Sequence, residues 1–149
     1  MKKILRFLPL VLIVLVGMGL SSCSDDDDEK TITETELPGV AKNFIRQYFP
    51  DATIRSAQKG NNEYEVKLSD GTDIDFDKEG NWKDVDAAPG QTIPSGFYPE
   101  AIDNYIAANM NGTGINEISK EGAGYDVQLL TGVELLFGLD GSFIGYDVD

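Results

Sequence analysis

Apolar and polar residues alternate along two neighbouring stretches in the middle of the chain, residues 63–68 and 72–77. In the first, Tyr, Val and Leu alternate with Glu and Lys, and in the second, Thr, Ile and Phe alternate with Asp. Alternation with one apolar side predicts strands of an antiparallel sheet that is covered on one face only. Ser69-Asp70-Gly71 between the two stretches predicts a tight hairpin.

A strand over residues 54–58 is expected before this hairpin, and a second turn leads to a last strand that starts at Trp82. The loop length places Phe76 opposite Trp82, as a cross-strand aromatic pair. If Trp82 faces the core, strict alternation would turn Val85 towards solvent. We therefore predict a bulge near residue 84.

Helical spacing of apolar residues occurs twice, each time before a set of strands. Pro38 precedes the first helical segment, where a missing N–H does no harm, and Pro50 follows it. The apolar positions are Val40, Phe44, Ile45, Tyr48 and Phe49 in the first segment, and Phe97, Ala101, Ile102, Tyr105 and Ile106 in the second. Such a stripe predicts a core face rather than a ligand site.

The two helices and their strands belong to an internal repeat. Nine identities recur at a spacing of 61 within the 33 positions from 54 to 86. The pairs are Ile54/Ile115, Lys59/Lys120, Tyr64/Tyr125, Val66/Val127, Leu68/Leu129, Gly71/Gly132, Phe76/Phe137, Gly80/Gly141 and Asp86/Asp147. A repeat of this kind predicts two copies of one structural unit.

The predicted fold class is α+β, a tandem αβββ repeat in which each helix packs on one face of an antiparallel sheet. Unit one spans residues 37–86 and unit two spans residues 93–149, joined by a turn-rich linker at 87–92. Because neither unit buries much surface alone, we expect the two to share a core or to continue one sheet.

The N-terminus resembles a bacterial lipoprotein signal, which predicts a leader over residues 1–22. A basic start and an apolar run end at Leu20-Ser21-Ser22-Cys23, and Cys23 is the chain's one cysteine. The resemblance implies acylation of Cys23 and attachment of the protein to a membrane. A transmembrane anchor is the alternative, but the run ends at the cysteine motif rather than at a basic stop-transfer cluster.

Residues 23–36 are predicted to form an acidic, disordered tether, because like charges repel one another and extend the chain. Ser24, Asp25, Asp26, Asp27 and Asp28 resemble the acidic export tag that sends lipoproteins of some diderm bacteria to the cell surface. The expected location is therefore the outer membrane with surface exposure, and its periplasmic face is the alternative. Adjacent carboxylates on a flexible chain are not a preorganised metal site.

The charge restricts the partners. The chain carries −14, and removal of the leader with its three bases leaves −17. Such a chain repels nucleic acid, so no nucleic-acid partner is expected. A cationic partner would suit it, although acidity also serves solubility.

No catalytic motif is present. The chain has no histidine, which excludes Ser-His, Cys-His and His-based zinc chemistry, and we expect neither an enzyme nor a cofactor. Asp73, Asp75 and Asp77 suggest a calcium loop, but Lys78 stands where such a loop needs glycine and Asp84 where it needs glutamate. No metal site is assigned.

The order of helix, strand, Tyr-x-Val-x-Leu, turn Gly, Phe, turn Gly and aromatic residue resembles the PepSY-like, beta-lactamase-inhibitor-like family of small exported proteins. Glu63–Val85 and Tyr125–Tyr146 carry the resemblance, with helices from Leu37 and Ile93. The resemblance implies a sheet face that is open to solvent, and in inhibitor relatives such a face binds a protein. No inhibitory residue motif carries over, so beta-lactamase inhibition is not inferred.

The open face of unit two differs most from its counterpart, because Leu136 and Ile144 replace Asp75 and Lys83. An apolar patch rimmed by acids is typical of a partner site, unless neighbouring chain covers it or it packs between the units. The candidate partner face comprises Asp126, Gln128, Leu130, Glu134, Leu136 and Ile144.

We therefore expect a lipid-anchored envelope binding module that presents this face to a protein or peptide, with an inhibitor-like role as one form. One alternative is an acidic cation-binding or structural envelope lipoprotein, and another is a hydrolase that uses carboxylates alone.

Overall fold

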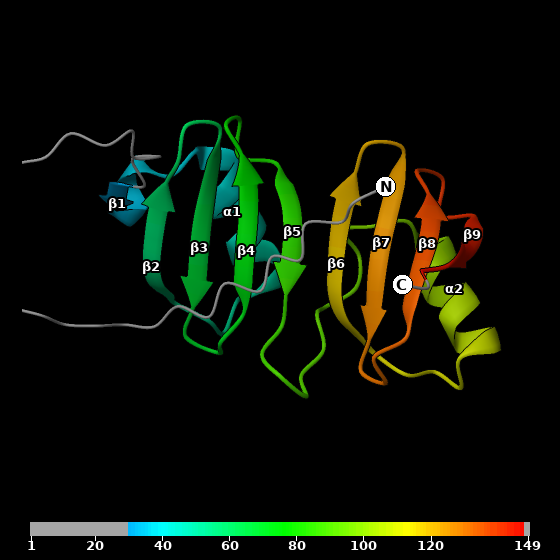
Figure 1. Ribbon diagram of the computed structural model, residues 1–149. Helices are drawn as coiled ribbons and strands as arrows, with labels where there is room; N and C mark the ends of the chain where they lie inside the picture. The colour runs from blue at the N-terminus through cyan, green and yellow to red at the C-terminus, as the bar shows by residue number, and fades with distance from the viewer. Residues whose placement is uncertain (1–29, 148–149) are drawn as a thin grey trace, which may run out of the picture.

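The computed structural model describes residues 30–147 (Figure 1). The leader, Cys23 and the acidic tag at residues 24–28 lie outside the described residues. Ahead of the first α-helix come strand β1 and a short 3-10 helix. In chain order the elements are β1 Lys30–Ile32, the 3-10 helix Glu34–Glu36, α1 Gly39–Tyr48, β2 Ile54–Lys59, β3 Glu63–Leu68, β4 Asp73–Asp77, β5 Trp82–Asp86, α2 Glu100–Asn109, β6 Ile115–Glu121, β7 Gly124–Leu129, β8 Glu134–Gly138 and β9 Phe143–Tyr146.

The nine strands of the described residues form one antiparallel sheet, in which spatial order equals chain order from β1 to β9. Both helices lie behind the sheet in Figure 1, α1 over the first half and α2 over the second. Among residues 30–147, no helix lies on the other face, which is turned towards the viewer. The α+β fold class expected from the sequence is therefore confirmed.

Each helix begins directly after a proline, but the predicted apolar stripes do not match the helices fully, because Phe97 precedes α2 and Val40 of α1 is 52% exposed. α1 follows Pro38 and closes at Phe49, whose N–H donates to the carbonyl of Ile45. α2 follows Pro99 in the same way. Ala41 and Ile45 of α1 are buried against the sheet, as are Ile102 and Ile106 of α2.

Four strands follow each helix, so the predicted αβββ description is one strand short. The segment expected from residues 54 to 58 is a full member of the sheet, and it pairs with β3. The register of the two halves agrees where the sequences agree: Tyr64 lies opposite Phe76, and Tyr125 lies opposite Phe137.

The predicted bulge is confirmed. Phe76 lies opposite Trp82, but Asp75 lies opposite Asp84, so Lys83 is the extra residue. The bulge returns Val85 to the core, where it is fully buried. The second half repeats the irregularity, with Phe137 opposite Phe143 and a register shift beside it.

The halves join through the β5–β6 pair and through an aromatic cluster. β5 pairs antiparallel with β6, with Val85 opposite Ile118. Phe97, which precedes α2, packs against Phe44 and Tyr48 of α1 and against Trp82, with ring centroids 5.0 to 5.2 Å apart. One sheet and one core therefore span both halves.

Part of the predicted tether belongs to this fold. Residues 30–32 pair with β2, and Ile32 is buried, because it continues the apolar side of the sheet. Leu37, at the end of the 3-10 helix, is buried as well. The prediction of disorder was wrong for residues 30–36, and the remaining tether residues lie outside the described part.

Candidate functional site

The helix-free face of the sheet, here called the open face, carries two transverse rows of side chains. The strand registers bring residues from each strand into line across the sheet. The Lys67 row contains Lys67, Asp73, Asp86, Glu117, Gln128 and Glu134, and reaches Asp147, whose N–H donates to the Glu134 carbonyl. The Glu65 row contains Glu65, Asp75, Asp84, Ser119, Asp126, Leu136 and Gly145. Most of these charged side chains are acidic and half-buried.

In the first half, a lysine lies among these acids. Lys67 Nζ lies 2.9 Å from Asp73 Oδ2 and 3.3 Å from Glu65 Oε1. The hydrogen bond to Asp73 raises the pKa of the Lys67 ammonium. Lys83 Nζ, at the bulge, lies 3.0 Å from Glu63 Oε2. These pairs are partly exposed, so each contributes little to stability, but they balance charge locally.

In the second half, the equivalent positions carry no lysine. Gln128 stands where Lys67 stands, whereas the acids are kept. The carboxylates of Asp126, Glu134 and Asp147 converge, with one oxygen of each within 4.8 Å of the others. They are called the three-carboxylate cluster below. They are the counterparts of Glu65, Asp73 and Asp86, which surround or flank Lys67.

Burial and like charges raise the pKa of two acids at the β5–β6 junction. The pKa of Asp84 rises to about 8, mainly through burial and then through the negative charge of Glu117 and other neighbouring acids. The pKa of Glu117 rises to about 7, through burial and then through Asp86, Asp126 and Glu134. Both carboxyl groups therefore keep their protons to a higher pH than free carboxyl groups do, and a cation bound nearby would lower both pKa values.

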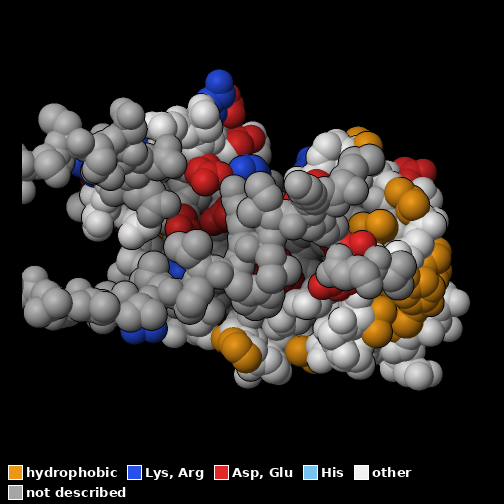
Figure 2. All heavy atoms as spheres, viewed as in Figure 1, with side chains coloured by type: hydrophobic (Ala, Val, Ile, Leu, Met, Phe, Trp, Pro, Cys, Tyr) orange, Lys and Arg blue, Asp and Glu red, His pale blue; other side chains and the backbone are white. Residues whose placement is uncertain are grey.

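The apolar residues of the candidate partner face do not all lie together in the structure. Leu136 lies on the open face opposite Asp126 and is half-buried. Ile144 lies at the β9 bulge and is 65% exposed, so neighbouring chain within the described residues does not cover it. Leu130 lies beyond the end of β7, where its N–H donates to the Gly114 carbonyl, and it does not join the others. Apolar side chains gather at the β8–β9 end of the molecule, on the right in Figure 2.

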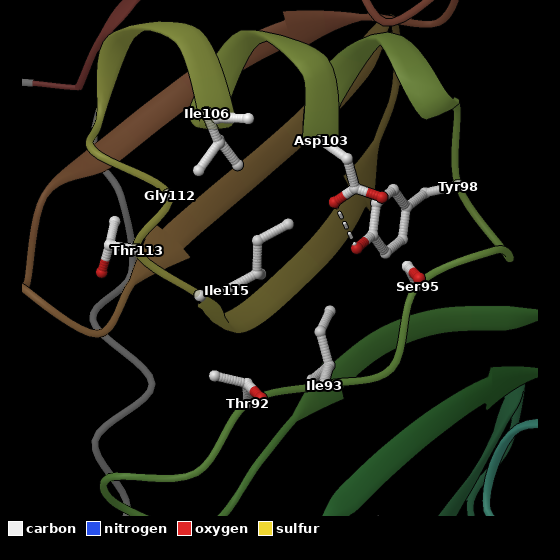
Figure 3. A pocket seen from close by; sticks show the side chains of 11 residues that line it. Thr92, Ile93, Ser95, Tyr98, Asp103, Ile106, Gly112, Thr113 and Ile115 are labelled. Atoms are coloured by element: carbon white, nitrogen blue, oxygen red, sulfur yellow. Dashed lines mark hydrogen bonds between the residues drawn. The ribbon is translucent and has the colours of Figure 1, made fainter.

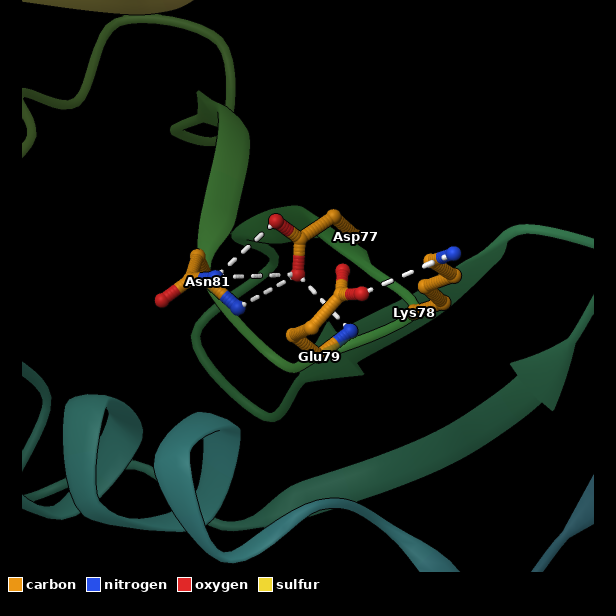
Figure 4. A network of polar contacts seen from close by, with 4 residues as sticks. All are labelled: Asp77, Lys78, Glu79 and Asn81. Atoms are coloured by element: carbon orange, nitrogen blue, oxygen red, sulfur yellow. Dashed lines mark hydrogen bonds and ion pairs between the residues drawn. The ribbon is translucent and has the colours of Figure 1, made fainter.

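The turn from Asp77 to Asn81 is held together by its own hydrogen bonds and does not have the geometry of a calcium loop (Figure 4). Asp77 Oδ1 accepts hydrogen bonds from the backbone N–H groups of Glu79 and Asn81, at 3.0 and 2.8 Å. Its Oδ2 accepts one from the Asn81 side chain. Asp73 and Asp75 lie on an extended strand, so these acids do not converge with Asp77 on one point.

A hollow of about 260 Å³ lies between the linker and the C-terminal end of α2 (Figure 3). Thr92, Ile93, Ile106 and Ile115 line it, together with the Gly112–Gly114 segment. Its one carboxylate, Asp103, accepts a hydrogen bond of 2.9 Å from the Tyr98 hydroxyl. Polar side chains, among them Thr92, Ser95 and Thr113, line the hollow together with the isoleucines, and we assign it no function.

Sequence reasoning identified Asp126 and Glu134 but missed the third member of the cluster. Asp147 is a repeat identity with Asp86, so the signal was present in the sequence. It lies one residue beyond β9, where only the observed register shows that its carboxylate turns towards Glu134.

Together, the one-sided sheet and its acidic open face define a class of small α+β proteins. The sequence matches the family described as "Putative beta-lactamase-inhibitor-like, PepSY-like" over residues 26–71 and 62–145. The chain belongs to this family, as the sequence resemblance indicated. No curated protein sequence matches the chain.

Three solved structures from Bacteroides are similar over nearly their whole length. A "putative calcium-regulated periplasmic protein" from Bacteroides thetaiotaomicron is 32% identical, with a TM-score of 0.76, over 82% of this chain and 98% of that one. A "putative periplasmic protein" of the DUF2874 family from Bacteroides vulgatus is 30% identical, with a TM-score of 0.75, over 82% of this chain and 98% of that one. A second "putative periplasmic protein of unknown function" from Bacteroides vulgatus is 28% identical, with a TM-score of 0.75, over 80% of this chain and 99% of that one.

Neither helix within residues 30–147 is long and apolar enough to cross a membrane.

Proposed function

We propose that this protein is a non-catalytic binding module of the cell envelope, whose open face binds a cationic group of a protein or peptide partner. The binding site is the three-carboxylate cluster of Asp126, Glu134 and Asp147. The observation that carries the proposal is the exchange of Lys67 for Gln128 between equivalent positions of the two halves.

The first half is an internal example of what this arrangement accepts. There, an ammonium group lies within hydrogen-bonding distance of carboxylates from two strands. The second half keeps the carboxylates and replaces the lysine by a neutral amide, so its own sequence supplies no cation from that position. A lysine or arginine of a partner would restore the same charge pattern.

The neighbouring surface suits a protein partner. Leu136 and Ile144 place apolar surface beside the carboxylates, and interfaces commonly combine an apolar centre with charged residues at the rim. The raised pKa of Glu117 adds a second argument, because a cation bound nearby would lower that pKa and release a proton near neutral pH.

We further propose that Cys23 is acylated and that the acidic residues 24–28 direct the protein to the outer surface of the outer membrane. The periplasmic description of the similar structures supports an envelope location. Metabolic labelling with an alkyne fatty acid should label the wild-type chain and not Cys23→Ala. Equal labelling of both would contradict the anchor.

Calorimetry with a lysine peptide tests the binding site. An octapeptide of alternating Gly and Lys should bind the full chain, and the matched Gly and Gln peptide should not. Asp126→Asn should weaken binding at least about fivefold, because it removes one carboxylate from the cluster. Asp51→Asn, which removes an equal charge from the exposed turn after α1, is the control. Equal affinity of the wild type and both variants would contradict the proposed site.

Calcium is a second candidate ligand for the same cluster. Three carboxylates within 4.8 Å supply the hard oxygen ligands that calcium prefers, and one similar structure is described as a calcium-regulated protein. Calcium chloride at about 1 mM, in the range of weak extracellular sites, should then raise the Tm of the wild type and not of Asp126→Asn. No shift in the wild type would remove this candidate.

A further inference from the structure

β9 is the last strand of the sheet, and its outer edge is a row of backbone groups. In residues 30–147, no strand pairs with that edge. The Asp147 N–H points inward, since it donates to the Glu134 carbonyl of β8. Backbone groups of successive residues in an antiparallel strand point to opposite sides, so the N–H and C=O of Tyr146 point outward.

The first half shows how the equivalent edge, the outer edge of β5, is covered. β5 is the counterpart of β9, and β6 pairs with its outer side. In that pair, Val85 lies opposite Ile118 and Asp86 lies opposite Glu117. Val85 and Ile118 are both fully buried, so the junction is a closed one.

The equivalent side chains on β9 are exposed. Tyr146, the counterpart of Val85, is 52% exposed, and Ile144 beside it is 65% exposed. Phe143, the counterpart of Trp82, contacts Tyr105, Phe137 and Tyr146. Trp82, by contrast, also contacts Phe97 and Tyr125, which the following half supplies. Apolar residues at an unpaired edge are a template for strand addition.

We propose that β9 accepts an extended segment of the partner as an additional antiparallel strand, in the register that β6 uses on β5. The segment places an apolar side chain beside Tyr146 and a basic side chain opposite Asp147. The choice of a basic residue rests on the proposed function, whereas the strand pairing does not.

Charge complementarity selects this occupant. In the proposed pairing, the partner residue opposite Asp147 extends the Lys67 row beyond Glu134 and Asp147. It therefore lies beside the three-carboxylate cluster. In the β5–β6 pair, Glu117 lies opposite Asp86, and burial and then the negative charge of Asp86 raise the pKa of the Glu117 carboxyl group. A second copy of this chain fits less well, because β9 against β9 would bring together two acidic rows of chains that each carry −14.

The probe is a heptapeptide with the β6 sequence, Ile115–Glu121, in which lysine replaces both glutamates. Fluorescence polarisation with the full chain in detergent micelles measures its affinity. The peptide with both glutamates retained should bind at least about tenfold more weakly, because its acid meets Asp147 and Glu134.

A backbone modification of the peptide tests the pairing on the wild-type protein. N-methylation at the isoleucine that corresponds to Ile118 blocks the N–H that would face β9, and should weaken binding at least about tenfold. N-methylation at the next residue, the serine corresponding to Ser119, blocks an N–H that would face solvent and is the matched control. Equal binding of the two modified peptides overturns the strand-addition proposal.

Two protein variants test the same edge. Tyr146→Pro removes the outward N–H and should abolish binding, whereas Tyr146→Ala removes the ring and keeps the N–H, so it should retain part of the affinity. Binding that is insensitive to Tyr146→Pro, in a variant with an unchanged Tm, overturns the proposal. A dimer that forms without peptide and is dissolved by Tyr146→Pro would instead assign the edge to a second copy.

The two proposals fail in different ways. Loss of affinity in Asp126→Asn with no effect of N-methylation would retain the cationic site and reject strand addition. Sensitivity to N-methylation with equal affinity for the lysine and glutamate peptides would retain the edge and reject the cationic site.

Discussion

At the scale of single residues, the two halves differ most in how they balance negative charge. Lys67 lies among Glu65 and Asp73 on one side of the sheet, and Gln128 occupies the equivalent position among Asp126 and Glu134. Because the acids are kept and the base is lost, this exchange changes the local charge without changing the strand register. The chemistry of the open face therefore depends on a few side chains rather than on the fold.

Asp84 makes stability depend on pH in a defined direction. Its pKa is about 8 in the folded state against 3.8 ordinarily, so between these values the folded chain keeps a proton that the unfolded chain has lost. The free energy of unfolding should therefore fall as pH rises from about 4 to about 8. Glu117, with a pKa of about 7, adds to this trend.

Urea unfolding at about pH 5 and about pH 8 measures the effect. The wild type should lose stability on the order of a few kcal/mol between them, and Asp84→Asn should lose clearly less, because it removes the titrating group. Glu79→Gln, an exposed turn variant, should behave as the wild type does. A wild-type stability that rises over this range would contradict the charge assignment of the open face.

At the scale of elements, the turn glycines position the helices on the sheet. Gly80 and Gly141 have φ of +91° and +81°, and each lies against the start of its helix. A Cβ at Gly141 would lie 2.8 Å from Pro99 Cβ and 2.9 Å from Ala101 Cβ. Each β-turn therefore contacts the first turn of its own helix too closely for a side chain.

Gly141→Ala should destabilise the protein by roughly 2–4 kcal/mol, because it combines backbone strain with a steric clash. Gly132→Ala is a matched control, since Gly132 also has a φ of +81° but has no atom within 4 Å of an added Cβ. It should cost only about 1–2 kcal/mol. Urea denaturation of both variants provides the comparison, and equal losses would show that the turn does not press on α2.

The strand pattern could be predicted from sequence because burial on one face imposes period two. The bulge at Lys83 could be predicted as well, since Trp82 and Val85 must both reach the core. β1 could not, because the single buried residue Ile32 in an acidic segment gives no periodic signal. The convergence of Asp147 with Asp126 and Glu134 depends on register across three strands, which spacing along the chain does not define.

At the scale of the whole molecule, the two halves form one cooperative body. β5 and β6 continue the sheet, and Asn116 ties the linker to β6, since its side chain donates to the carbonyls of Ala87, Ala88 and Gln91. Phe97 completes the aromatic cluster of the first half from the sequence of the second. Neither half is therefore expected to unfold without the other.

Phe97→Ala should lower the free energy of unfolding by about 3 kcal/mol, because it opens a cavity between the halves. Fluorescence of Trp82, the chain's one tryptophan, reports on this junction, and circular dichroism reports on the whole sheet. The two probes should give coincident transitions in the wild type. Separate wild-type transitions would show that the halves unfold independently.

The affinity of the Gln128→Lys variant for a cation tests the proposed site most directly. It shows whether the second half binds an added cation at the place where the first half uses its own lysine. Calorimetry would compare the wild type, Gln128→Lys and the neutral control Gln128→Met, with the Gly and Lys octapeptide and with calcium. Whichever cation binds the wild type should bind Gln128→Met with similar affinity and Gln128→Lys at least about tenfold more weakly, because the new ammonium group occupies the cluster. Unchanged binding by Gln128→Lys would contradict the assignment of the site to Asp126, Glu134 and Asp147.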